Sequence, residues 1–262
     1  MAGRGRLAGK RAFISGAGGG IGAATAIKFA AEGAAVAAVD LKAEGLAATL
    51  GEIEAAGGSA VALTGDIADP VRCESLMSEA AGALGGLDVL FNNAGVLLPG
   101  DDGPVETPLE VWEKTLRVDL TGVFLACKYG IPHLERAGGG SVVNTASLVA
   151  LVGSAYPQIA YTAAKGGVLA MTREMAVQYG RKGIRFNAIC PGPVGTPLVK
   201  AFLSDEAAWN ARRPFMPMGR IAEPSEIAGL VAFLASDEAS YITGAAYPID
   251  GGISAAYVIK DD

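Results

Sequence analysis

A tyrosine and a lysine stand four residues apart in the stretch YTAAK, as Tyr161 and Lys165. On a helix this spacing places both side chains on one face, about one turn apart. A lysine ammonium beside a phenol favours the phenolate form of the tyrosine, and such a pair can act as a general acid and base near neutral pH. The pair alone is a weak signal, because short motifs of this kind also arise by chance.

A glycine-rich stretch, ISGAGGGIG, occupies residues 14–22, between an apolar run and a helical pattern. Glycines at a strand–helix junction allow a tight turn and a close approach of the backbone to a pyrophosphate. The N-terminus of the helix then presents free N–H groups to the phosphates. Because glycine accounts for 37 of the 262 residues, the position of the stretch counts for more than its pattern. The expected turn residues are Gly16, Gly19, Gly20, Ile21 and Gly22.

Asp40 ends the next apolar run, about twenty residues beyond the glycine turn, and Leu41 follows it. A carboxylate at this place can accept hydrogen bonds from both hydroxyls of an adenosine ribose. It would repel a 2′-phosphate, since like charges about 4 Å apart cost about 4 kcal/mol at an effective dielectric of about 20. We therefore expect Asp40 and Leu41 to bind the cofactor and to select NAD over NADP.

Two further motifs extend this interpretation. In GDIAD, Asp66 is placed to meet an adenine amino group and Ile67 to cover the adenine ring. The motif NNAG over residues 92–95 ends another apolar run, and its amides are expected at the carboxyl edge of the sheet, where ligands bind. Plain turn formation is the alternative role of the two asparagines. The expected cofactor contacts from this motif are Asn93, Ala94 and Gly95.

Short apolar runs alternate with helical patterns along the whole chain. Their lack of polar alternation is typical of strands buried on both faces of a parallel sheet. The expected strands cover residues 11–15, 34–40, 60–64, 87–91, 141–146, 184–190 and 245–250. The expected helices cover residues 20–32, 43–56, 70–84, 109–136, 158–181 and 223–235. These repeated units predict an α/β fold, a single doubly wound, Rossmann-type domain over residues 1–262 with a mainly parallel sheet and helices on both faces.

Composition and charge exclude several classes of function. The net charge of −6 argues against a nucleic-acid partner and against binding to an anionic membrane, and no apolar run reaches transmembrane length. Cys73, Cys127 and Cys190 form no CxxC pattern, which is typical of a reducing cytosol, and no secretory signal is recognised, so we expect a cytoplasmic protein. The single histidine, His133, excludes a histidine-rich metal site.

The motifs SGAGGGIG, NNAG, NTAS, YTAAK, NAICPGPVGTP and YPIDGG occur in an order that resembles the short-chain dehydrogenase/reductase family. The resemblance implies that Tyr161 exchanges a proton with the substrate oxygen. It implies that Lys165 assists Tyr161 and binds the nicotinamide ribose, and that Ser147 polarises the substrate carbonyl or hydroxyl. The residues implied to hold the nicotinamide carboxamide are Pro191, Gly192, Val194 and Thr196.

One residue departs from the family pattern. The family usually has an asparagine where RVDLTGVF has Asp119, and that asparagine helps to hold a water in the proton relay. An ionised aspartate accepts hydrogen bonds but cannot donate them. Its charge either supports the protonated form of Lys165 or, if it lies closer to the phenol, opposes the phenolate of Tyr161, and both remain open. Asp119 is the fourth expected catalytic residue.

The substrate site is expected between the segments 97–103 and 148–158 and the part 196–216 of a long loop near 193–222, whose length indicates a functional role. The expected substrate contacts are Ser147, Leu148, Val149, Tyr156 and Tyr161. Further expected lining residues are Leu97, Leu151, Val152, Phe202, Trp209, Phe215 and Met216. This apolar lining favours a ring-bearing or medium-sized secondary alcohol, which NAD would oxidise to the ketone.

Two other functions stay open. A reductase of 3-oxoacyl thioesters on an acyl carrier protein would use NADPH and a basic docking patch, with Lys128 and Arg136 as candidates. A non-catalytic dinucleotide sensor would have no need of Ser147, Tyr161 and Lys165 together. The resemblance also implies a homotetramer that pairs the helices over 109–136 and 158–181 and the last strand.

Overall fold

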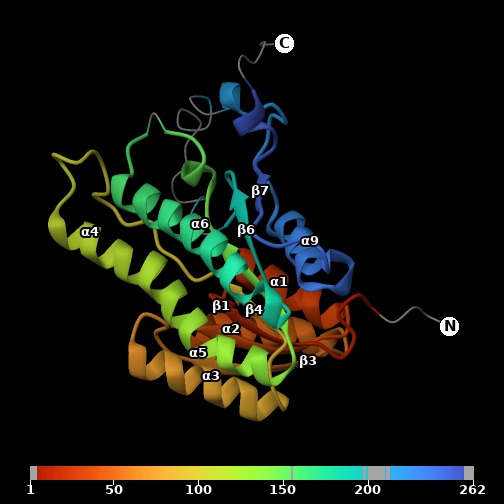
Figure 1. The fold of residues 1–262 in the computed structure, drawn as a ribbon. Helices are drawn as coiled ribbons and strands as arrows, with labels where there is room; N and C mark the ends of the chain where they lie inside the picture. Colours follow the sequence, from red (N-terminus) through yellow and green to blue (C-terminus); the bar gives the residue numbers. More distant parts are fainter. Residues whose placement is uncertain (1–4, 155, 197–198, 200–209, 211–212, 257–262) are drawn as a thin grey trace.

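The computed structural model describes residues 5–154, 156–196, 199, 210 and 213–256. Seven strands form one sheet in the order β3-β2-β1-β4-β5-β6-β7, and all neighbouring pairs are parallel (Figure 1). The strands are β1 (Arg11–Ser15), β2 (Ala35–Asp40), β3 (Ser59–Thr64), β4 (Val89–Asn92), β5 (Gly140–Thr145), β6 (Ile184–Pro191) and β7 (Ala246–Ile249). The predicted doubly wound sheet is confirmed.

The apolar runs become strands because both faces of the sheet are covered. Successive residues of a strand point to opposite faces. In β1, Phe13 belongs to the core on one face, whereas Ala12 and Ile14 belong to the core on the other. A strand with polar residues at alternate positions would place them in one of these two cores, which accounts for the continuous apolar runs.

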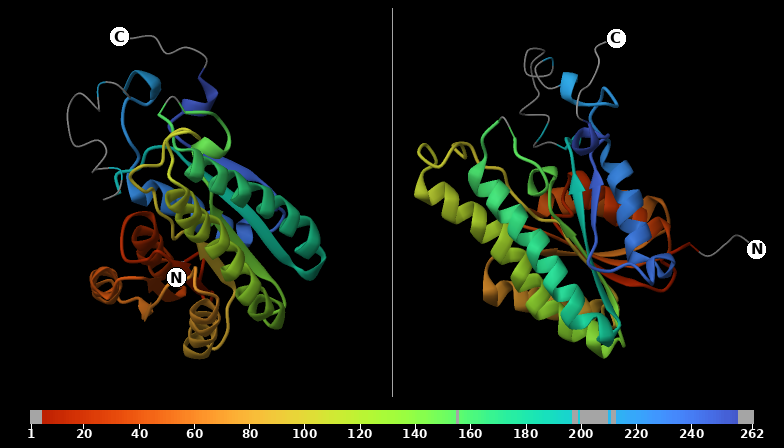
Figure 2. Two further views of the ribbon diagram at one scale, coloured as in Figure 1. Left: turned by 90° about the vertical axis from the view of Figure 1, so that its left-hand side faces the viewer. Right: turned by 45° about the horizontal axis from the view of Figure 1, so that its top comes forward.

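Helices form a layer on each face of the sheet (Figure 2). One core contains buried residues of α1 (Gly20–Ala31), α2 (Ala43–Ala55) and α9 (Pro224–Ala235). The other contains buried residues of α3 (Pro70–Leu84), α5 (Gly122–Arg136) and α6 (Ile159–Tyr179). The helix α4 (Leu109–Leu116) precedes α5 and packs beside α6.

The helix expected over 109–136 is not a continuous α-helix. Between α4 and α5 the chain forms a π-helical turn, η1 (Arg117–Thr121), which contains Asp119. A π-turn holds one residue more than an α-turn and often occurs at functional sites. The other long helix ends at Tyr179 and continues as the 3₁₀ turn η3 (Gly180–Lys182).

The segment 193–222 is described in part. Its two ends lie together, because the Gly195 N–H donates to the Ala222 carbonyl at 2.8 Å and the Ala222 N–H donates to the Pro193 carbonyl at 3.0 Å. The described part includes a 3₁₀ turn, η4 (Arg213–Phe215). The remaining 3₁₀ turns of the described chain are η2 (Leu148–Ala150), η5 (Asp237–Ala239) and η6 (Ile253–Ala255). Phe202 and Trp209, two expected substrate contacts, lie outside the described residues.

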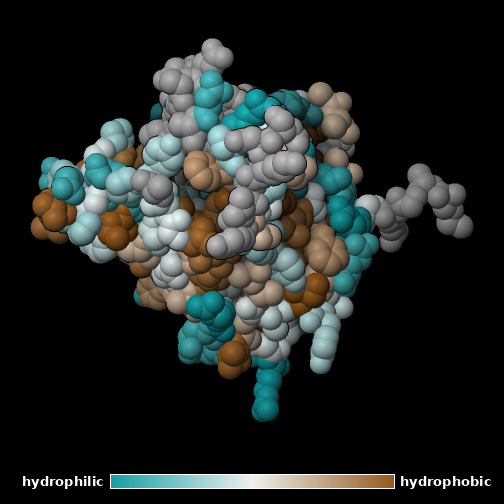
Figure 3. Space-filling view, turned by 90° about the horizontal axis from the view of Figure 1, so that it is seen from above, coloured by the Kyte–Doolittle hydropathy of each residue, from teal (hydrophilic) through white to brown (hydrophobic). Residues whose placement is uncertain are grey.

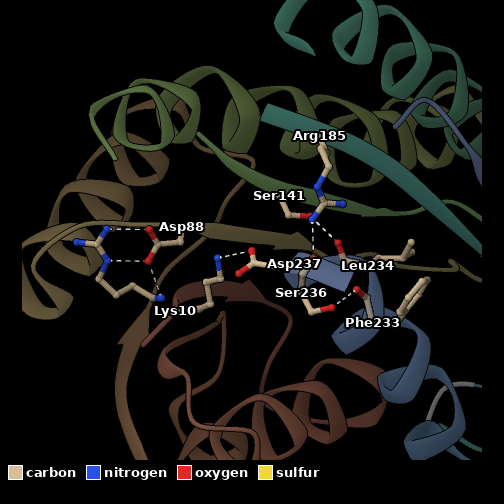
Figure 4. Close-up of polar contacts among 9 residues, drawn as sticks. Lys10, Asp88, Ser141, Arg185, Phe233, Leu234, Ser236 and Asp237 are labelled. Carbon is tan, nitrogen blue, oxygen red and sulfur yellow. Dashed lines mark hydrogen bonds and ion pairs between the residues drawn. The ribbon is translucent and has the colours of Figure 1, made fainter. Parts of the chain in front are cut away.

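Paired polar groups lie at the amino edge of the sheet (Figure 4). A hollow of about 700 Å³ opens there. Lys10 pairs with Asp237 at 2.7 Å, Asp88 pairs with Arg11 at 2.7 Å, and Arg185 donates to the Ser236 carbonyl at 3.0 Å. The charged groups around this hollow are therefore paired with one another or with backbone carbonyls.

The carboxyl edge has the topology of a ligand site. The chain leaves β1 toward β2 on one side, while β4 adds to the other side of β1. In open parallel sheets, ligands bind at the carboxyl ends of the strands, where the strand order reverses. In the described part of the chain, none of the helices combines the length and apolar character that a membrane crossing needs.

Candidate active site

The glycine turn leads from β1 into α1 with backbone conformations that favour glycine. Gly16 has φ 69° and Gly20 has φ 54°. A Cβ atom on Gly22 would collide with the Gly16 carbonyl oxygen, and nothing lies within 4 Å of a Cβ built on Gly19. No side chain caps α1, and its first turn carries no acid. This helix end is therefore open to an anionic group, and Ile21 in its first turn packs partly against the core.

Asp40 lies against this turn. Its carboxylate accepts hydrogen bonds from the Gly18 N–H at 2.9 Å and from the Lys42 N–H at 3.0 Å. Leu41 is 63% exposed beside it. The close glycine backbone, the open helix end and a carboxylate at the end of β2 together fit the binding of a dinucleotide. Sequence reasoning overlooked Gly18, where a Cβ atom would lie 2.9 Å from the Asp40 carboxyl carbon.

Asp66 follows β3 and is held on both carboxylate oxygens. One accepts from the Ala68 N–H at 2.8 Å, and the other forms an ion pair with Arg117 at 3.1 Å. Ile67 is buried, and its side chain points at Gly122 of α5, which leaves little of it to cover an adenine. Arg117 at the rim of this site was not expected, because it comes from a helical segment distant in sequence.

The two asparagines of NNAG face different ways. Asn92 was expected to face the ligand crevice, and this expectation is wrong. Its side chain is buried and donates to Asn144 at 2.9 Å. Asn144 in turn donates to Thr172 of α6 at 2.9 Å. Neighbouring residues of a strand point to opposite faces, so only one of the two could face the crevice.

Asn93 joins the glycine turn to the end of β4. Its side-chain amide donates to the Ser15 carbonyl at 3.2 Å and to the Gly16 carbonyl at 3.4 Å. The Ala94 N–H donates to the Ser15 hydroxyl at 3.2 Å, and a Cβ atom on Gly16 would lie 2.9 Å from the Ala94 Cα. These contacts fix the two loops of the candidate cofactor site against each other.

Tyr161 and Lys165 lie on one face of α6, as their spacing predicts. The Lys165 ammonium lies 5.5 Å from the centre of the Tyr161 ring, within cation–π range. It donates to the Thr145 carbonyl at the end of β5, at 3.1 Å. The lysine is only 2% exposed, so its charge acts on its neighbours with little screening by water.

Asp119 lies beside this lysine and is fully buried. One carboxylate oxygen accepts from the Val96 N–H at 2.7 Å, and the other has no partner among the described residues. Burial raises the pKa of Asp119, and the nearby Lys165 and the Val96 N–H oppose this rise. Asp119 is the buried residue of the π-turn η1.

Ser147 follows β5 and opens the turn η2. Its hydroxyl accepts from the Val149 N–H at 3.4 Å, and the side chain is 8% exposed. Thr145, the acceptor of Lys165, lies two residues earlier on the same strand end. Thus β5 holds Ser147 at the edge of the sheet that Lys165 also reaches.

The segment after β6 completes the carboxyl edge. Pro191 ends the strand, and the Gly192 N–H donates to the Ile249 carbonyl at 3.1 Å. A Cβ atom on Gly192 would lie 2.8 Å from the Asp250 Cα, so the close approach requires glycine. Val194 is buried, and the Thr196 N–H donates to its carbonyl at 2.6 Å.

Apolar side chains gather on the face above the carboxyl edge (Figure 3). The exposed ones include Leu151, Val152, Tyr156 and Phe215 at 39%, 38%, 44% and 66%. Leu97, Leu148 and Val149 are half-buried. Met216 was an expected lining residue, but it is buried, and Met218 is exposed in its place. An apolar face of this kind suits a ligand with little charge.

Comparison with known proteins identifies the family of the chain. The family model described as enoyl-(acyl carrier protein) reductase matches residues 16–254. A cis-4-hydroxycyclohexanecarboxylate dehydrogenase from Sinomonas cyclohexanicum is 42% identical over 245 residues, 93% of this chain and 96% of that protein. A cyclohexanol dehydrogenase from an Acinetobacter species is 39% identical over 243 residues, 92% of this chain and 94% of that protein.

A solved structure shows the same fold in detail. The crystal structure of an Agrobacterium tumefaciens protein with bound NADP is 36% identical, covers 95% of this chain and 98% of that one, and has a TM-score of 0.88. The family model and both dehydrogenases align with nearly the whole chain. The chain belongs to the short-chain dehydrogenase/reductase family.

Proposed function

We propose that this oxidoreductase transfers a hydride from an apolar or cyclic secondary alcohol to NAD and releases the ketone. The observation that carries this proposal is the buried lysine of α6. Lys165 lies 5.5 Å from the Tyr161 ring and 3.1 Å from the Thr145 carbonyl, with Asp119 beside it. A buried ammonium next to a half-buried phenol is an arrangement suited to proton transfer at that phenol.

In the proposed mechanism, a bound nicotinamide supplies the hydride acceptor. Ser147 donates a hydrogen bond to the substrate oxygen and holds it. Tyr161, as phenolate, takes the hydroxyl proton while the carbon–hydrogen bond breaks. Lys165 stabilises the phenolate by its charge. The same groups act in the opposite order when a ketone is reduced.

Asp119 is the fourth residue of the proposed site. Its unpartnered oxygen is buried beside Lys165, and a buried polar atom of this kind calls for a partner such as a bound water. We propose that this oxygen accepts a hydrogen bond from a water of the proton relay. An asparagine, usual in the family, carries one oxygen and one NH2 group, so with its oxygen on the Val96 N–H it would present a donor here and no charge.

For the cofactor, we propose NAD. Gly16, Gly19, Gly20 and Gly22 with Ile21 would receive the pyrophosphate, Asp40 the adenosine ribose, and Leu41 and Asp66 the adenine. The segment Asn93–Gly95 would lie under the dinucleotide, and Pro191, Gly192, Val194 and Thr196 would hold the carboxamide. The support for NAD is the Asp40 carboxylate at the turn. The Agrobacterium protein binds NADP, so the choice has to be measured.

The proposed substrate class follows from two observations. Leu148 and Val149 directly follow Ser147 in the chain and are half-buried, and Tyr156 is exposed. The two dehydrogenases above act, by their names, on cyclohexanol and on a hydroxycyclohexane carboxylate. We propose a six-membered ring alcohol. The whole chain would serve as one domain, with the segment 193–222 bordering the substrate.

We also propose that the protein is a cytoplasmic homotetramer. The helices α5 and α6 form an apolar groove on the surface, lined by Phe124, Ile131, Pro132, Met171, Met175 and Tyr179 among others. Phe124 is 49% exposed and Val177 of α6 is 85% exposed. Sedimentation of the purified protein tests this assembly.

The activity is tested with a panel of alcohols and both nicotinamide cofactors. Cyclohexanol, cis-4-hydroxycyclohexanecarboxylate, butane-2,3-diol and a 3-hydroxyacyl thioester would each be mixed with NAD or NADP. We expect the highest kcat/KM for a ring alcohol with NAD. Highest activity for the thioester with NADP would support the alternative, a reductase of 3-oxoacyl thioesters on an acyl carrier protein.

A further inference from the structure

The N-terminus of the catalytic helix is capped by a distant loop. The residue before α6, Gln158, makes no side-chain capping bond. The first N–H of the helix, that of Ile159, donates to the Asp102 carbonyl at 3.0 Å. The next two, those of Ala160 and Tyr161, donate to the two carboxylate oxygens of Asp101, each at 2.9 Å.

The loop is built to present Asp101. The Asp101 N–H donates to the Leu98 carbonyl at 3.3 Å, and the Asp102 N–H donates to the Thr107 hydroxyl at 2.9 Å. The Thr107 N–H closes the loop on the Gly103 carbonyl at 2.9 Å. Asp101 is therefore held by bonds within its own loop while its carboxylate spans two amides of α6.

One of those two amides belongs to Tyr161 itself. A carboxylate that receives two N–H groups at a helix N-terminus is favoured by the charge and by the helix dipole. Because the bond is made at the backbone of the tyrosine, it limits where the phenol can lie. The same loop follows β4 and the segment Asn93–Gly95, so the bond links the proposed cofactor floor to the proposed acid/base.

We propose that Asp101 is a positioning residue for Tyr161, which holds the first turn of α6 so that the phenol meets the substrate oxygen. This inference rests on the proposed role of Tyr161. A displacement of about 1 Å in a catalytic group can lower a rate by about a hundredfold. A residue without contact to substrate can therefore control turnover.

The adjacent aspartate offers a matched control. Asp102 is exposed, and its side chain accepts only from the Gly103 N–H at 2.7 Å among the bonds of the described residues. Its bond to α6 uses the backbone carbonyl, which an alanine keeps. Asp102→Ala thus removes the same charge from the same loop and leaves the helix cap in place.

The experiment compares Asp101→Ala, Asp101→Asn, Asp102→Ala and Tyr161→Phe with the wild type. We expect kcat for a ring alcohol to fall about 10- to 100-fold in Asp101→Ala, with the dissociation constant of NADH changed less than about twofold. The solvent deuterium isotope effect on kcat should rise, because proton transfer to a displaced tyrosine becomes slower. Amide hydrogen exchange should accelerate in the peptide that contains Ile159–Tyr161. Asp101→Asn, which keeps one acceptor oxygen, should lie between.

Asp102→Ala should retain wild-type kcat and isotope effect. An Asp101→Ala enzyme that folds and keeps kcat within about twofold of the wild type would overturn the proposal. If that variant does not fold, an unchanged kcat and isotope effect in Asp101→Asn would overturn it instead. A Tyr161→Phe variant with full turnover would refute the proposed role of Tyr161. If Tyr161→Phe loses turnover while Asp101→Ala keeps it, only the proposed role of Asp101 is refuted.

Discussion

Asp119 and Lys165 border the same small space beside Gly95, where a Cβ atom would lie 2.8 Å from the Asp119 Oδ1 and 3.2 Å from the Lys165 Nζ. Three elements meet at this point, because Gly95 follows β4, Asp119 lies in η1 and Lys165 lies in α6. The space is too small for any side chain on Gly95. The glycine at position 95 therefore leaves the room in which Asp119 and Lys165 lie close together.

Gly95→Ala should therefore disturb both charged residues. The added methyl group must displace the buried carboxylate or the ammonium, and such overpacking costs about 1–3 kcal/mol. We expect a lower free energy of unfolding by that amount in urea titrations, together with a lower kcat. The control is Gly82→Ala, in the middle of α3, where nothing lies within 4 Å of the new Cβ atom. Equal stability of Gly95→Ala and the wild type would contradict the packing described here.

Asp119 should make stability depend on pH. Burial raises the pKa of Asp119 above its ordinary value of 3.8, and Asp101 adds to the rise, while Lys165 and the Val96 N–H oppose it. The folded state therefore ionises this carboxyl less readily than the unfolded state does. Its contribution to stability is fully present below about pH 4 and is lost as the pH rises through the folded-state pKa.

Asp119→Asn removes this penalty. We expect the variant to gain stability relative to the wild type as the pH rises, by about 1.4 kcal/mol for each unit by which the pKa is raised. Urea unfolding at about pH 5 and about pH 8 measures the difference. The same gain in the free energy of unfolding at both pH values, or a loss that grows with pH, would contradict a raised pKa of Asp119 in the folded state.

Asp40→Ser should shift the cofactor preference. The variant removes the carboxylate that lies against the glycine turn and leaves room for a 2′-phosphate. We expect the ratio of kcat/KM for NADP to that for NAD to rise about 10- to 100-fold, which corresponds to about 1.4–2.8 kcal/mol. Glu44→Gln, an exposed acid in the first turn of α2, is the control for a general charge effect. No change in the ratio for Asp40→Ser would remove the argument for NAD.

Phe124→Lys should weaken the proposed assembly. The substitution places a charge in the apolar groove of α5 and α6, where a partner subunit would have to bury it. We expect sedimentation at a lower mass than the wild type at equal concentration. Val71→Lys replaces an equally apolar residue that is 79% exposed on α3, and it should leave the mass unchanged. Identical sedimentation of all three proteins would place the interface elsewhere.

The sheet was predictable because its central strands are largely apolar runs, which suit a sheet covered on both faces, although the edge strand β3 has no fully buried residue. The pairing of Tyr161 with Lys165 was predictable because helical spacing alone sets it. The π-turn at Asp119 was not, since one additional residue in a helical turn leaves no mark on a pattern of apolar residues.

Other features depend on contacts between segments far apart in sequence. Asn92 and Asn93 are neighbouring residues of the same type. Only the alternation of side chains at the end of β4 decides that Asn92 is buried against Asn144. The ion pair of Asp66 with Arg117 joins β3 to η1. Asp101 gives no signal of its own, because the amides that it caps lie 59 and 60 residues further along the chain.

The account depends most on Tyr161 as the acid/base of alcohol oxidation. The direct measurement is the rate of NAD reduction with cyclohexanol by the wild type and by Tyr161→Phe, with NADH binding followed by fluorescence in both. We expect the variant to bind NADH as the wild type does and to lose turnover by about 10²- to 10⁴-fold, the usual contribution of a general acid or base. Equal turnover by the two proteins would contradict the mechanism.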